Sequence, residues 1–155
     1  MLISRRAFLP RALAAGVGAA LVAAGDTARA QPRPSEFVFA RLRYASGDWD
    51  YNPKVAANVL NSLVEYTNIP VYRDEVVIPA DAPDLAAFPF LFMTGHLLVR
   101  FSDRERRGLR AFVEQGGLLF SDDCNHDIDG LYARSFEQEM RATFGKAGEM
   151  PKIPA

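Results

Sequence analysis

Short apolar runs separated by polar or glycine-rich stretches predict the strands of this chain. The run FPFLFMTG, residues 88–95, is apolar throughout and ends in glycine, which is typical of a strand buried inside a parallel sheet. Residues 36–44, EFVFARLRY, are apolar on both faces at their start and also favour a covered strand. The prolines and charges of residues 69–79 place another extended segment near an edge. The run LLFSDD, residues 118–123, predicts a fourth strand in the centre of the sheet.

Apolar residues at helical spacing predict three helices between and after these strands. Asn52 and Pro53 suit the N-cap and first position of the first helix. Ser102, with Glu105 three residues later, predicts a capping box that begins the second helix, and residues 116–117 end it. The residues expected to face the core are Val55, Val59, Leu60, Leu63 and Val64 in the first helix, Leu109, Phe112 and Val113 in the second, and Leu131, Phe136, Met140 and Phe144 in the third.

The order of these elements predicts an α/β fold with a doubly wound, mostly parallel sheet of the flavodoxin-like type. Strands alternate with helices, and crossovers between parallel strands are right-handed. Residues 36–155 are therefore expected to form one α/β domain, preceded by a proline-rich linker at residues 31–35. Four strands are few for such a sheet, so we expect the domain to be incomplete at its C-terminus, as a fragment or a short gene model.

Residues 1–30 have the pattern of an export signal. Arg5 and Arg6 precede a 13-residue apolar run, residues 12–24, and the small-residue site ARA follows at residues 28–30. The paired arginines predict the twin-arginine route, with cleavage after Ala30. A helix of that length spans about 20 Å, too short for the roughly 30 Å of a bilayer core. We therefore expect a periplasmic or secreted protein without a permanent membrane anchor.

Charge and cysteine content narrow the function classes. Four of the 18 basic residues and one of the 19 acidic residues lie within residues 1–30, so the mature chain has a net charge of −4. Phosphate contacts need clustered Lys and Arg, which argues against nucleic acid as a partner. Cys124 is the single cysteine of the sequence and cannot form an internal disulfide. The sequence identifies no cofactor.

The topology of open α/β sheets locates a candidate ligand site. Ligands bind outside the carboxyl ends of the strands, where the strand order reverses. If the strands lie in the order 2-1-3-4, the loops after the first, third and fourth strands meet at one edge. We call the polar and aromatic residues expected there the candidate ligand rim: Asp48, Trp49, Asp50, Thr94, His96, Asp122 and Asp123.

Metal and thiol chemistry at this rim have weak sequence support. His96, Asp122, Asp123 and His126 are of metal-ligand type, but no tight spacing such as HExxH joins them, so we assign no metal. Cys124 lies between Asp123 and an asparagine, without the small neighbours of a nucleophile elbow. Nearby carboxylates would also disfavour the thiolate that nucleophilic attack requires.

A pair of carboxylates offers a more definite mechanism. Asp48 and Asp122 follow neighbouring predicted strands, and two carboxyl groups roughly 5–9.5 Å apart hydrolyse glycosides. Trp49, beside Asp48, could stack on a sugar ring. The competing interpretation packs Trp49 over the open end of the sheet and uses Asp50 as a helix cap. His96 has no evident structural role in its turn.

Four segments in combination resemble the bacterial domain of unknown function family 4159. They are FARLRYASGDWDYNP, FPFLFMTGH, LRAFVEQGGLLFSDD and FEQEMRATFG, and the resemblance runs from about Phe37 to the C-terminus. The family looks like a relative of the class I glutamine amidotransferase and trehalose-utilisation-protein folds. In those folds the strand after the Gly-Gly turn leads to the functional position. Here that position falls near residues 121–123, where no cysteine stands, so amidotransferase chemistry is not implied.

The same resemblance implies further strands beyond the end of this chain. Some members of the family look like partners of periplasmic or membrane systems that contain AAA ATPases and von Willebrand A domains. The family has no established activity, so the resemblance implies a fold and no catalytic residues.

These observations favour an exported, non-catalytic module that binds a small polar ligand or a periplasmic protein partner at the candidate ligand rim. The alternative is a periplasmic hydrolase, directed at carbohydrate and assisted by carboxylates or a metal, that uses Asp48, His96 and Asp122. An enzyme that uses Cys124 as a thiol nucleophile is the least favoured interpretation.

Overall fold

The computed structural model describes two stretches of the chain, residues 32–125 and 130–151. The predicted export signal with Arg5 and Arg6 lies outside the described residues, as does His126. Among the described helices, none has the length and apolar content needed to cross a membrane. The elements in chain order are β1 (Ala40–Arg43), α1 (Val55–Tyr66), β2 (Val76–Pro79), η1 (Leu85–Ala87), β3 (Phe90–Gly95), α2 (Asp103–Glu114), β4 (Leu118–Asp123), α3 (Leu131–Phe144) and η2 (Gly145–Gly148).

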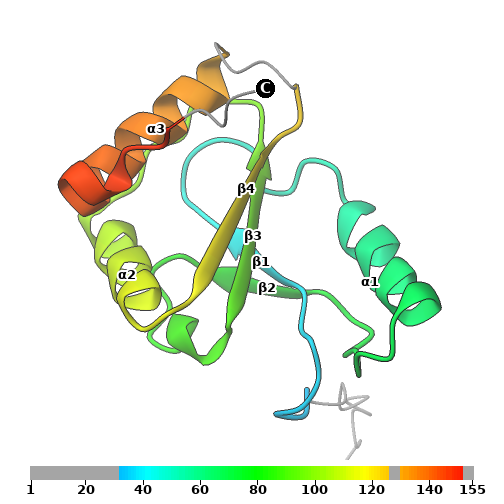
Figure 1. The fold of residues 1–155 in the computed structure, drawn as a ribbon. Helices are drawn as coiled ribbons and strands as arrows, with labels where there is room; N and C mark the ends of the chain where they lie inside the picture. Colours follow the sequence, from blue (N-terminus) through cyan, green and yellow to red (C-terminus); the bar gives the residue numbers. More distant parts are fainter. Residues whose placement is uncertain (1–31, 126–129, 152–155) are drawn as a thin grey trace, which may run out of the picture. The chain divides into compact units, whose positions relative to one another are not determined.

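The four strands form one parallel sheet in the order β2-β1-β3-β4 (Figure 1). This confirms the predicted α/β fold class, with a parallel sheet of the flavodoxin-like type, and the order is the one that the candidate ligand rim assumes. In the sheet formed by the described residues β4 lies at an edge, which contradicts the prediction of a central strand at residues 118–123. The first strand is also shorter than predicted, because only Ala40–Arg43 pair as β1, after an isolated bridge between Phe37 and Val71.

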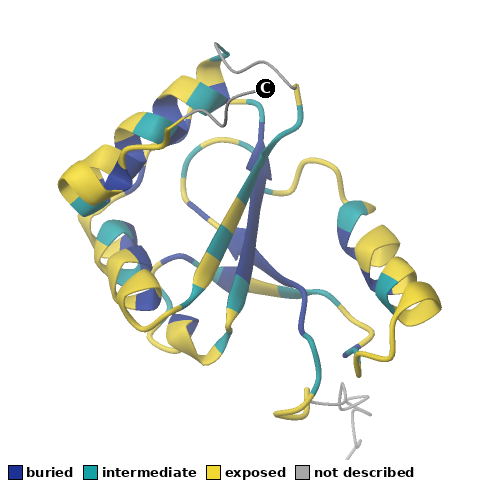
Figure 2. Cartoon of the chain, in the orientation of Figure 1, coloured by how far each residue is buried: buried dark blue, intermediate teal, exposed yellow. Residues whose placement is uncertain are grey.

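Helices lie on both faces of the sheet and make a three-layer structure (Figure 1). Side chains alternate across a strand, so even-numbered residues of β3 face α1 and odd-numbered residues face α2 and α3. The buried cluster on the α1 face consists of Phe39, Ala56, Leu60 and Phe92. The larger cluster on the other face includes Leu42, Leu91, Met93, Leu109, Phe112, Tyr132, Phe136 and Met140. β3 is the most deeply buried strand, whereas β4 has exposed and half-buried residues (Figure 2).

The start of α2 confirms the sequence prediction and the start of α1 does not. The side chain of Ser102 accepts a hydrogen bond from the backbone N–H of Glu105, and Glu105 Oε2 accepts one from the backbone N–H of Ser102, so the capping box is complete. α1 begins at Val55, with Lys54 at the N-cap. Asn52 has a φ of 64° and forms a left-handed turn ahead of the helix instead of capping it.

The predicted core faces of the helices are only partly buried. Leu60, Leu109, Phe112, Phe136 and Met140 are buried as expected. The members of the predicted set that are more than a third exposed are Val59, Val64, Val113 and Leu131. The reason is that the flanks of the helices that carry these residues have no further layer beside them within the described part of the chain.

A buried arginine holds the loop after β1 against the sheet. The side chain of Arg41 is 2% exposed, forms an ion pair with Glu75, and places its guanidinium carbon 5.5 Å from the ring centre of Phe92. It also donates hydrogen bonds of 3.3–3.5 Å to three carbonyl oxygens of the loop, those of Trp49, Tyr51 and Asn52. A guanidinium can be buried only when its charge and its N–H groups find partners, and the loop carbonyls provide them.

We predict that Arg41→Met lowers the free energy of unfolding by about 3 kcal/mol, because it leaves Glu75 and the loop carbonyls without their buried donor. Arg43→Met alters an exposed residue of the same strand and serves as the control, with an expected change within about 0.5 kcal/mol. Urea denaturation followed by circular dichroism measures both. Equal losses in the two variants would show that the buried interactions of Arg41 are not what stabilises the loop.

Candidate functional site

The carboxyl ends of β1, β3 and β4 lie next to one another, so the loops that follow them meet at one edge of the sheet. The loop after β1, residues 44–53, lies at the point where the connections change direction: β1 leads through α1 to β2, whereas β3 leads through α2 to β4. This is the place where open α/β sheets bind ligands. The candidate ligand rim is therefore built by three separate stretches of the chain.

Asp48 ties the loop after β1 to the loop after β3. Its Oδ1 accepts hydrogen bonds from the backbone N–H groups of His96, at 3.1 Å, and Leu97, at 3.0 Å. Its Oδ2 forms an ion pair with Nδ1 of His96 when the imidazole is protonated, and both of these atoms are buried. The carboxylate of Asp48 is therefore committed to holding the loop and orienting the imidazole.

Gly95 allows this close approach. A Cβ at this position would lie 2.6 Å from the hydroxyl oxygen of Tyr44 and 2.9 Å from Oδ1 of Asp48. Both distances are shorter than any normal contact, so a larger residue would displace Asp48 from the amides that it binds. The glycine at the end of β3 is thus required by the packing of the loop after β1, and not by a positive φ.

Two buried tyrosines form the floor beneath the loops. The hydroxyl of Tyr44 donates a hydrogen bond of 2.9 Å to the carbonyl oxygen of Thr94, and the hydroxyl of Tyr132 lies 2.8 Å from the hydroxyl of Ser121. Burial is the main cause that raises the pKa of both tyrosines far above its ordinary value. Both phenols therefore stay protonated and act as hydrogen-bonding packing groups.

Cys124 is tied to the end of β3. Its backbone N–H and its Sγ both hydrogen bond to the carbonyl oxygen of Gly95, at 3.3 Å and 3.1 Å. Burial raises the pKa of the thiol, and the carboxylates of Asp48, Asp123 and Asp122 raise it further. The thiol is therefore protonated at neutral pH. This agrees with the sequence analysis, in which an enzyme with a thiol nucleophile is the least favoured interpretation.

An open hollow lies between the loop after β1 and the end of β4. It has a volume of about 600 Å³ and is lined by Asp50, Tyr51, Asn52, Pro53 and Cys124. The ring of Tyr51 makes an edge contact with the imidazole of His96, with the ring centres 4.4 Å apart. Tyr51 is 47% exposed and was missed by the sequence interpretation, although its position two residues after Trp49 was a signal.

The members of the candidate ligand rim differ in their accessibility. Asp50 is exposed, and His96, Asp122 and Asp123 are half-buried. Thr94 is completely buried, with no hydrogen-bond partner for its Oγ1 among the described residues, so it lies beneath the rim. The indole of Trp49 packs against the larger core cluster, as the packing interpretation expected, but Asp50 does not cap α1, whose N-cap is Lys54.

Asp123 closes the end of β4. Its Oδ1 accepts a hydrogen bond of 3.0 Å from the backbone N–H of Asn125. Its Oδ2 is buried and has no hydrogen-bond partner within the described part of the chain. The register of the sheet places Gly95 opposite Asp123 and Thr94 opposite Asp122, so both acids lie directly beside the loop that carries His96.

The sequence interpretation also missed Glu105, which is only 5% exposed. In addition to capping α2, its Oε1 accepts a hydrogen bond of 2.8 Å from the backbone N–H of Ala45. One carboxylate thus joins the start of α2 to the loop after β1. Trp49, Glu105 and Arg43 line a second hollow of about 380 Å³ next to this contact. The capping-box motif identified the local role of Glu105, but its bond to Ala45 depends on the fold.

Within residues 32–125 and 130–151, no group of three His, Cys, Asp or Glu side chains is arranged to hold a metal ion. Of the weak metal candidates, His96 binds Asp48, Asp122 and Asp123 lie at the end of β4, and His126 is outside the described residues. The described residues therefore give no basis for naming a metal.

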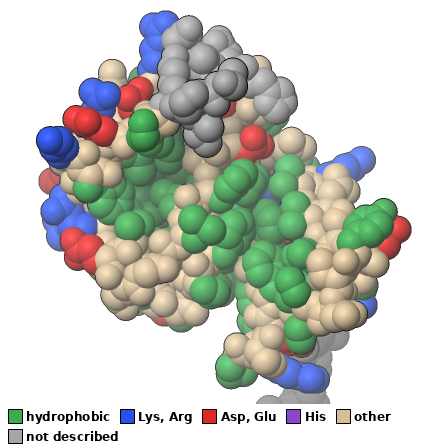
Figure 3. All heavy atoms as spheres, in the orientation of Figure 1, with side chains coloured by type: hydrophobic (Ala, Val, Ile, Leu, Met, Phe, Trp, Pro, Cys, Tyr) green, Lys and Arg blue, Asp and Glu red, His purple; other side chains and the backbone are tan. Residues whose placement is uncertain are grey.

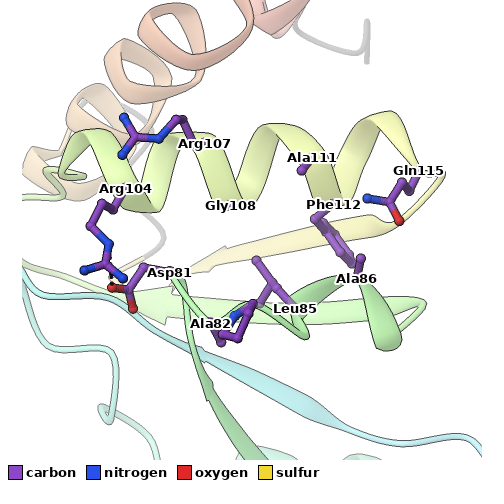
Figure 4. A pocket seen from close by; sticks show the side chains of 11 residues that line it. Asp81, Ala82, Leu85, Ala86, Arg104, Arg107, Gly108, Ala111, Phe112 and Gln115 are labelled. Atoms are coloured by element: carbon purple, nitrogen blue, oxygen red, sulfur yellow. Dashed lines mark ion pairs between the residues drawn. The ribbon is translucent and has the colours of Figure 1, made fainter.

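Another hollow lies between α2 and η1, and Asp81, which lines it, also lines the hollow beside Trp49 (Figure 4). It has a volume of about 320 Å³, and Arg104 and Asp81 point toward each other at its mouth, with 3.6 Å between Nε and Oδ2. A Cβ on Gly108 would lie 2.3 Å from the carbonyl oxygen of Ala80, so this glycine lets α2 approach the end of β2. The exposed ion pair is of the kind that contributes little to stability.

The fold and the loops at the carboxyl edge define an α/β protein with a flavodoxin-like parallel sheet and a polar carboxyl edge. The chain belongs to the family described as a domain of unknown function (DUF4159), whose model matches residues 38–155. No curated protein matches the chain.

We predict that Cys124 reacts with iodoacetamide more slowly at neutral pH than an exposed peptide cysteine does, because its raised pKa leaves less thiolate. Asp123→Asn removes one of the charges that raise the pKa, so it should move the rate-against-pH curve to lower pH. Asp50→Asn is the control and should leave the curve in place, because Asp50 lines the same hollow but is not among the charges that act on the thiol. A curve for the unmodified protein that matches that of the peptide would contradict the assignment.

Proposed function

We propose that the protein is an exported, non-catalytic module that binds a small polar ligand, or a loop of a periplasmic partner protein, at the candidate ligand rim. The observation that carries this proposal is the contact of Asp48 with His96 and Leu97. It holds the half-buried imidazole in one orientation, with Nδ1 buried and the ring centre 4.4 Å from that of Tyr51, which lines the open hollow. A pre-organised polar group beside an open hollow is what a binding site needs, because less ordering is lost when the ligand binds.

The charges at this edge indicate the chemistry of the ligand. Asp50 and Asp122 supply carboxylate oxygens, which only accept hydrogen bonds when ionised. The exposed ring of Tyr51 adds an apolar surface next to His96. A ligand with several donors, such as hydroxyl or ammonium groups, around a small apolar body is complementary to this arrangement.

The nucleophilic groups near the rim favour binding over catalysis. The hydroxyl of Ser121 is bonded to Tyr132, and the thiol of Cys124 donates to Gly95 and has a raised pKa. Oδ1 of Asp48 accepts from two backbone amides, so this carboxylate is not free to attack a substrate. Each of these groups already makes a hydrogen bond within the fold.

One observation favours the second candidate function, a periplasmic hydrolase. Asp48 holds His96 through Nδ1, which is how an acidic residue orients a histidine that acts as a general base. In such an enzyme the other ring nitrogen of His96 would take a proton from water, and Asp122 would assist at the opposite loop. A glycoside or an ester would be the substrate class.

Export is part of the proposal and rests on residues 1–30. The paired Arg5 and Arg6, the apolar run and the small-residue site support passage through the twin-arginine route, with cleavage after Ala30. A relation to the class I glutamine amidotransferase-like folds is likewise proposed, on the resemblance described above. Partners that belong to systems with AAA ATPases and von Willebrand A domains are consistent with a binding module.

We predict that ligands with several donors raise the melting temperature of the mature protein. Glucose, N-acetylglucosamine, lysine and spermidine are suitable probes, and a ligand at about 100 times its Kd stabilises the fold by about 2.7 kcal/mol, or roughly 10 °C. His96→Gln and Asp122→Asn should abolish the shift, while Arg107→Gln, in the hollow of Figure 4, should retain it.

Activity assays on the mature protein and its rim variants distinguish a binding module from a hydrolase. Turnover of p-nitrophenyl hexosides or p-nitrophenyl acetate that falls by about 10²–10⁴-fold in His96→Gln would establish the hydrolase in place of the binding module. The absence of any shift across the probes, or shifts that persist in both rim variants, would remove the rim as the binding site.

We predict that the full-length chain, produced in a bacterium that has the twin-arginine system, is recovered from the periplasm with Gln31 as its first residue. Replacing both Arg5 and Arg6 with lysine should keep it in the cytoplasm with residues 1–30 attached, while Arg11→Lys, outside the pair, should be exported normally. Cell fractionation and intact mass measure the outcome. Export of the double-lysine variant would contradict the twin-arginine assignment.

A further inference from the structure

The hollow beside Trp49 lies at the carboxyl ends of β1 and β2 and is separate from the hollow beside His96. Its volume of about 380 Å³ falls within the roughly 300–1,000 Å³ that is usual for ligand pockets. The two hollows have no lining residue in common. We call it the Trp49 hollow, and its lining includes Arg43, Tyr44, Trp49, Asp81, Ser102 and Glu105.

The Trp49 hollow is formed by strands on the side of the sheet opposite to β4. Figure 3 shows apolar side chains gathered on the side of the molecule that carries β4, where Leu118 is 60% exposed and Phe120 is 52% exposed. Further strands of the domain, which the family resemblance implies, would pair with β4 and cover these side chains. Such strands would not pair near the Trp49 hollow, because β3 and β1 lie between β4 and β2.

Hydrogen bonds between distant parts of the chain hold the walls of the Trp49 hollow. The backbone N–H of Ala80 donates a bond of 2.8 Å to the carbonyl oxygen of Arg43, which joins the ends of β2 and β1. Glu105 Oε1 accepts a bond of 2.8 Å from the backbone N–H of Ala45, which joins the start of α2 to the loop after β1. Walls that are already ordered cost little further ordering when a ligand binds.

Trp49 gives this hollow a flat apolar surface. Its indole packs against the larger core cluster, and the residue is half-buried, so part of it remains open to the hollow. The carbonyl oxygen of Trp49 also accepts a hydrogen bond of 3.5 Å from the guanidinium of Arg41. An aromatic ring held in this way offers a large apolar contact area in one orientation.

The polar groups of the Trp49 hollow include both signs of charge. The guanidinium of Arg43 only donates hydrogen bonds, and it has no ion-pair partner among the residues that the structure describes. The carboxylate of Asp81 lies 3.6 Å from Arg104 and its side chain remains 41% exposed, so it can accept further bonds. A charged ligand of either sign would meet a like charge here. A hydroxyl group both donates and accepts, so it suits Arg43, Asp81 and the hydroxyl of Ser102.

The start of α2 does not turn this hollow into an anion site. The side chain of Ser102 already accepts the backbone N–H of Glu105, and Glu105 accepts that of Ser102. The carboxylates of Glu105 and Asp81 also add negative charge to the lining. The hollow therefore favours a neutral ligand over a phosphate or a carboxylate.

We propose that the Trp49 hollow binds a neutral pyranose unit of a carbohydrate, with the apolar face of the sugar ring against Trp49 and its hydroxyl groups bonded to Arg43 and Asp81. A free sugar and one unit of a longer glycan share this chemistry. The proposal adds a second site to the proposed function and does not rest on it, because it involves neither His96 nor Asp122.

Fluorescence tests the proposal directly, because Trp49 is the single tryptophan of the sequence. Titration of the mature protein with glucose, mannose, galactose or N-acetylglucosamine should change the emission of Trp49 in a saturable way for at least one sugar. Sorbitol, an open-chain polyol without a ring face, should cause no saturable change at the same concentrations. Cellotriose, maltotriose and triacetylchitotriose identify the source: tighter binding than that of the monosaccharide assigns the hollow to a glycan, and equal or weaker binding assigns it to a free sugar.

Variants of the charged lining test the contacts. Asp81→Ala and Arg43→Ala should each weaken sugar binding by about tenfold or more, because each removes a hydrogen bond to a charged group. Asp84→Ala is the matched control and should leave the affinity unchanged, since Asp84 is an exposed acid that does not line the hollow and makes no cap bond to η1. Unchanged melting temperatures in the absence of sugar show that the variants are folded.

Three results would overturn the proposal: no saturable change with any of these sugars, a response to sorbitol equal to that of the sugars, or equal affinities in Asp81→Ala and Asp84→Ala. His96→Gln distinguishes this hollow from the rim. A response that is retained in His96→Gln and lost in Asp81→Ala supports the Trp49 hollow, and the reverse pattern assigns the sugar to the hollow beside His96 and contradicts the proposal. Lysine and spermidine have no pyranose ring, so their melting shifts test the rim alone.

Discussion

The buried guanidinium of Arg41 is the contact on which the carboxyl edge of the sheet depends. A positive charge can remain beneath α1 only because Glu75 and three carbonyl groups of the following loop surround it. Because three carbonyl groups of the loop bind the same guanidinium, the loop between β1 and α1 is held in one conformation. This conformation places Asp48 where its carboxylate accepts hydrogen bonds from the backbone N–H groups of His96 and Leu97. The geometry of the candidate ligand rim therefore depends on the buried charge of Arg41.

The loop after β1 is held from both faces of the sheet. Arg41 binds it on the α1 face, and Glu105 binds Ala45 at the start of α2. Gly95 completes the arrangement, because the space that a side chain would take is occupied by Tyr44 and Asp48. The part of the sheet where ligands usually bind is thus filled by this chain's own loop, and the surface left for a ligand is the layer above it, around His96 and Tyr51.

The molecule presents two surfaces of different chemistry. The carboxyl edge is acidic and polar, whereas the start of β4 and the hollow beside it are lined by apolar side chains. The acids at the end of β4 belong to both, since Asp122 and Asp123 end the strand and also face the loop that carries His96.

The sequence by itself determined the α/β class, the capping box of α2 and, for the assumed strand order 2-1-3-4, the three loops that lie at the carboxyl edge. These features depend on local pattern: apolar runs, cap residues and the rule that parallel strands share one carboxyl edge. Only the tertiary structure decided that Asp48 is an anchor, that Thr94 is buried, that Asn52 turns ahead of α1, and that β4 is an edge strand. The physical reason is that each of these depends on groups distant in sequence. Asp48 and His96 are 48 residues apart, and Ala45 and Glu105 are 60 apart, so no local pattern could show that one binds the other.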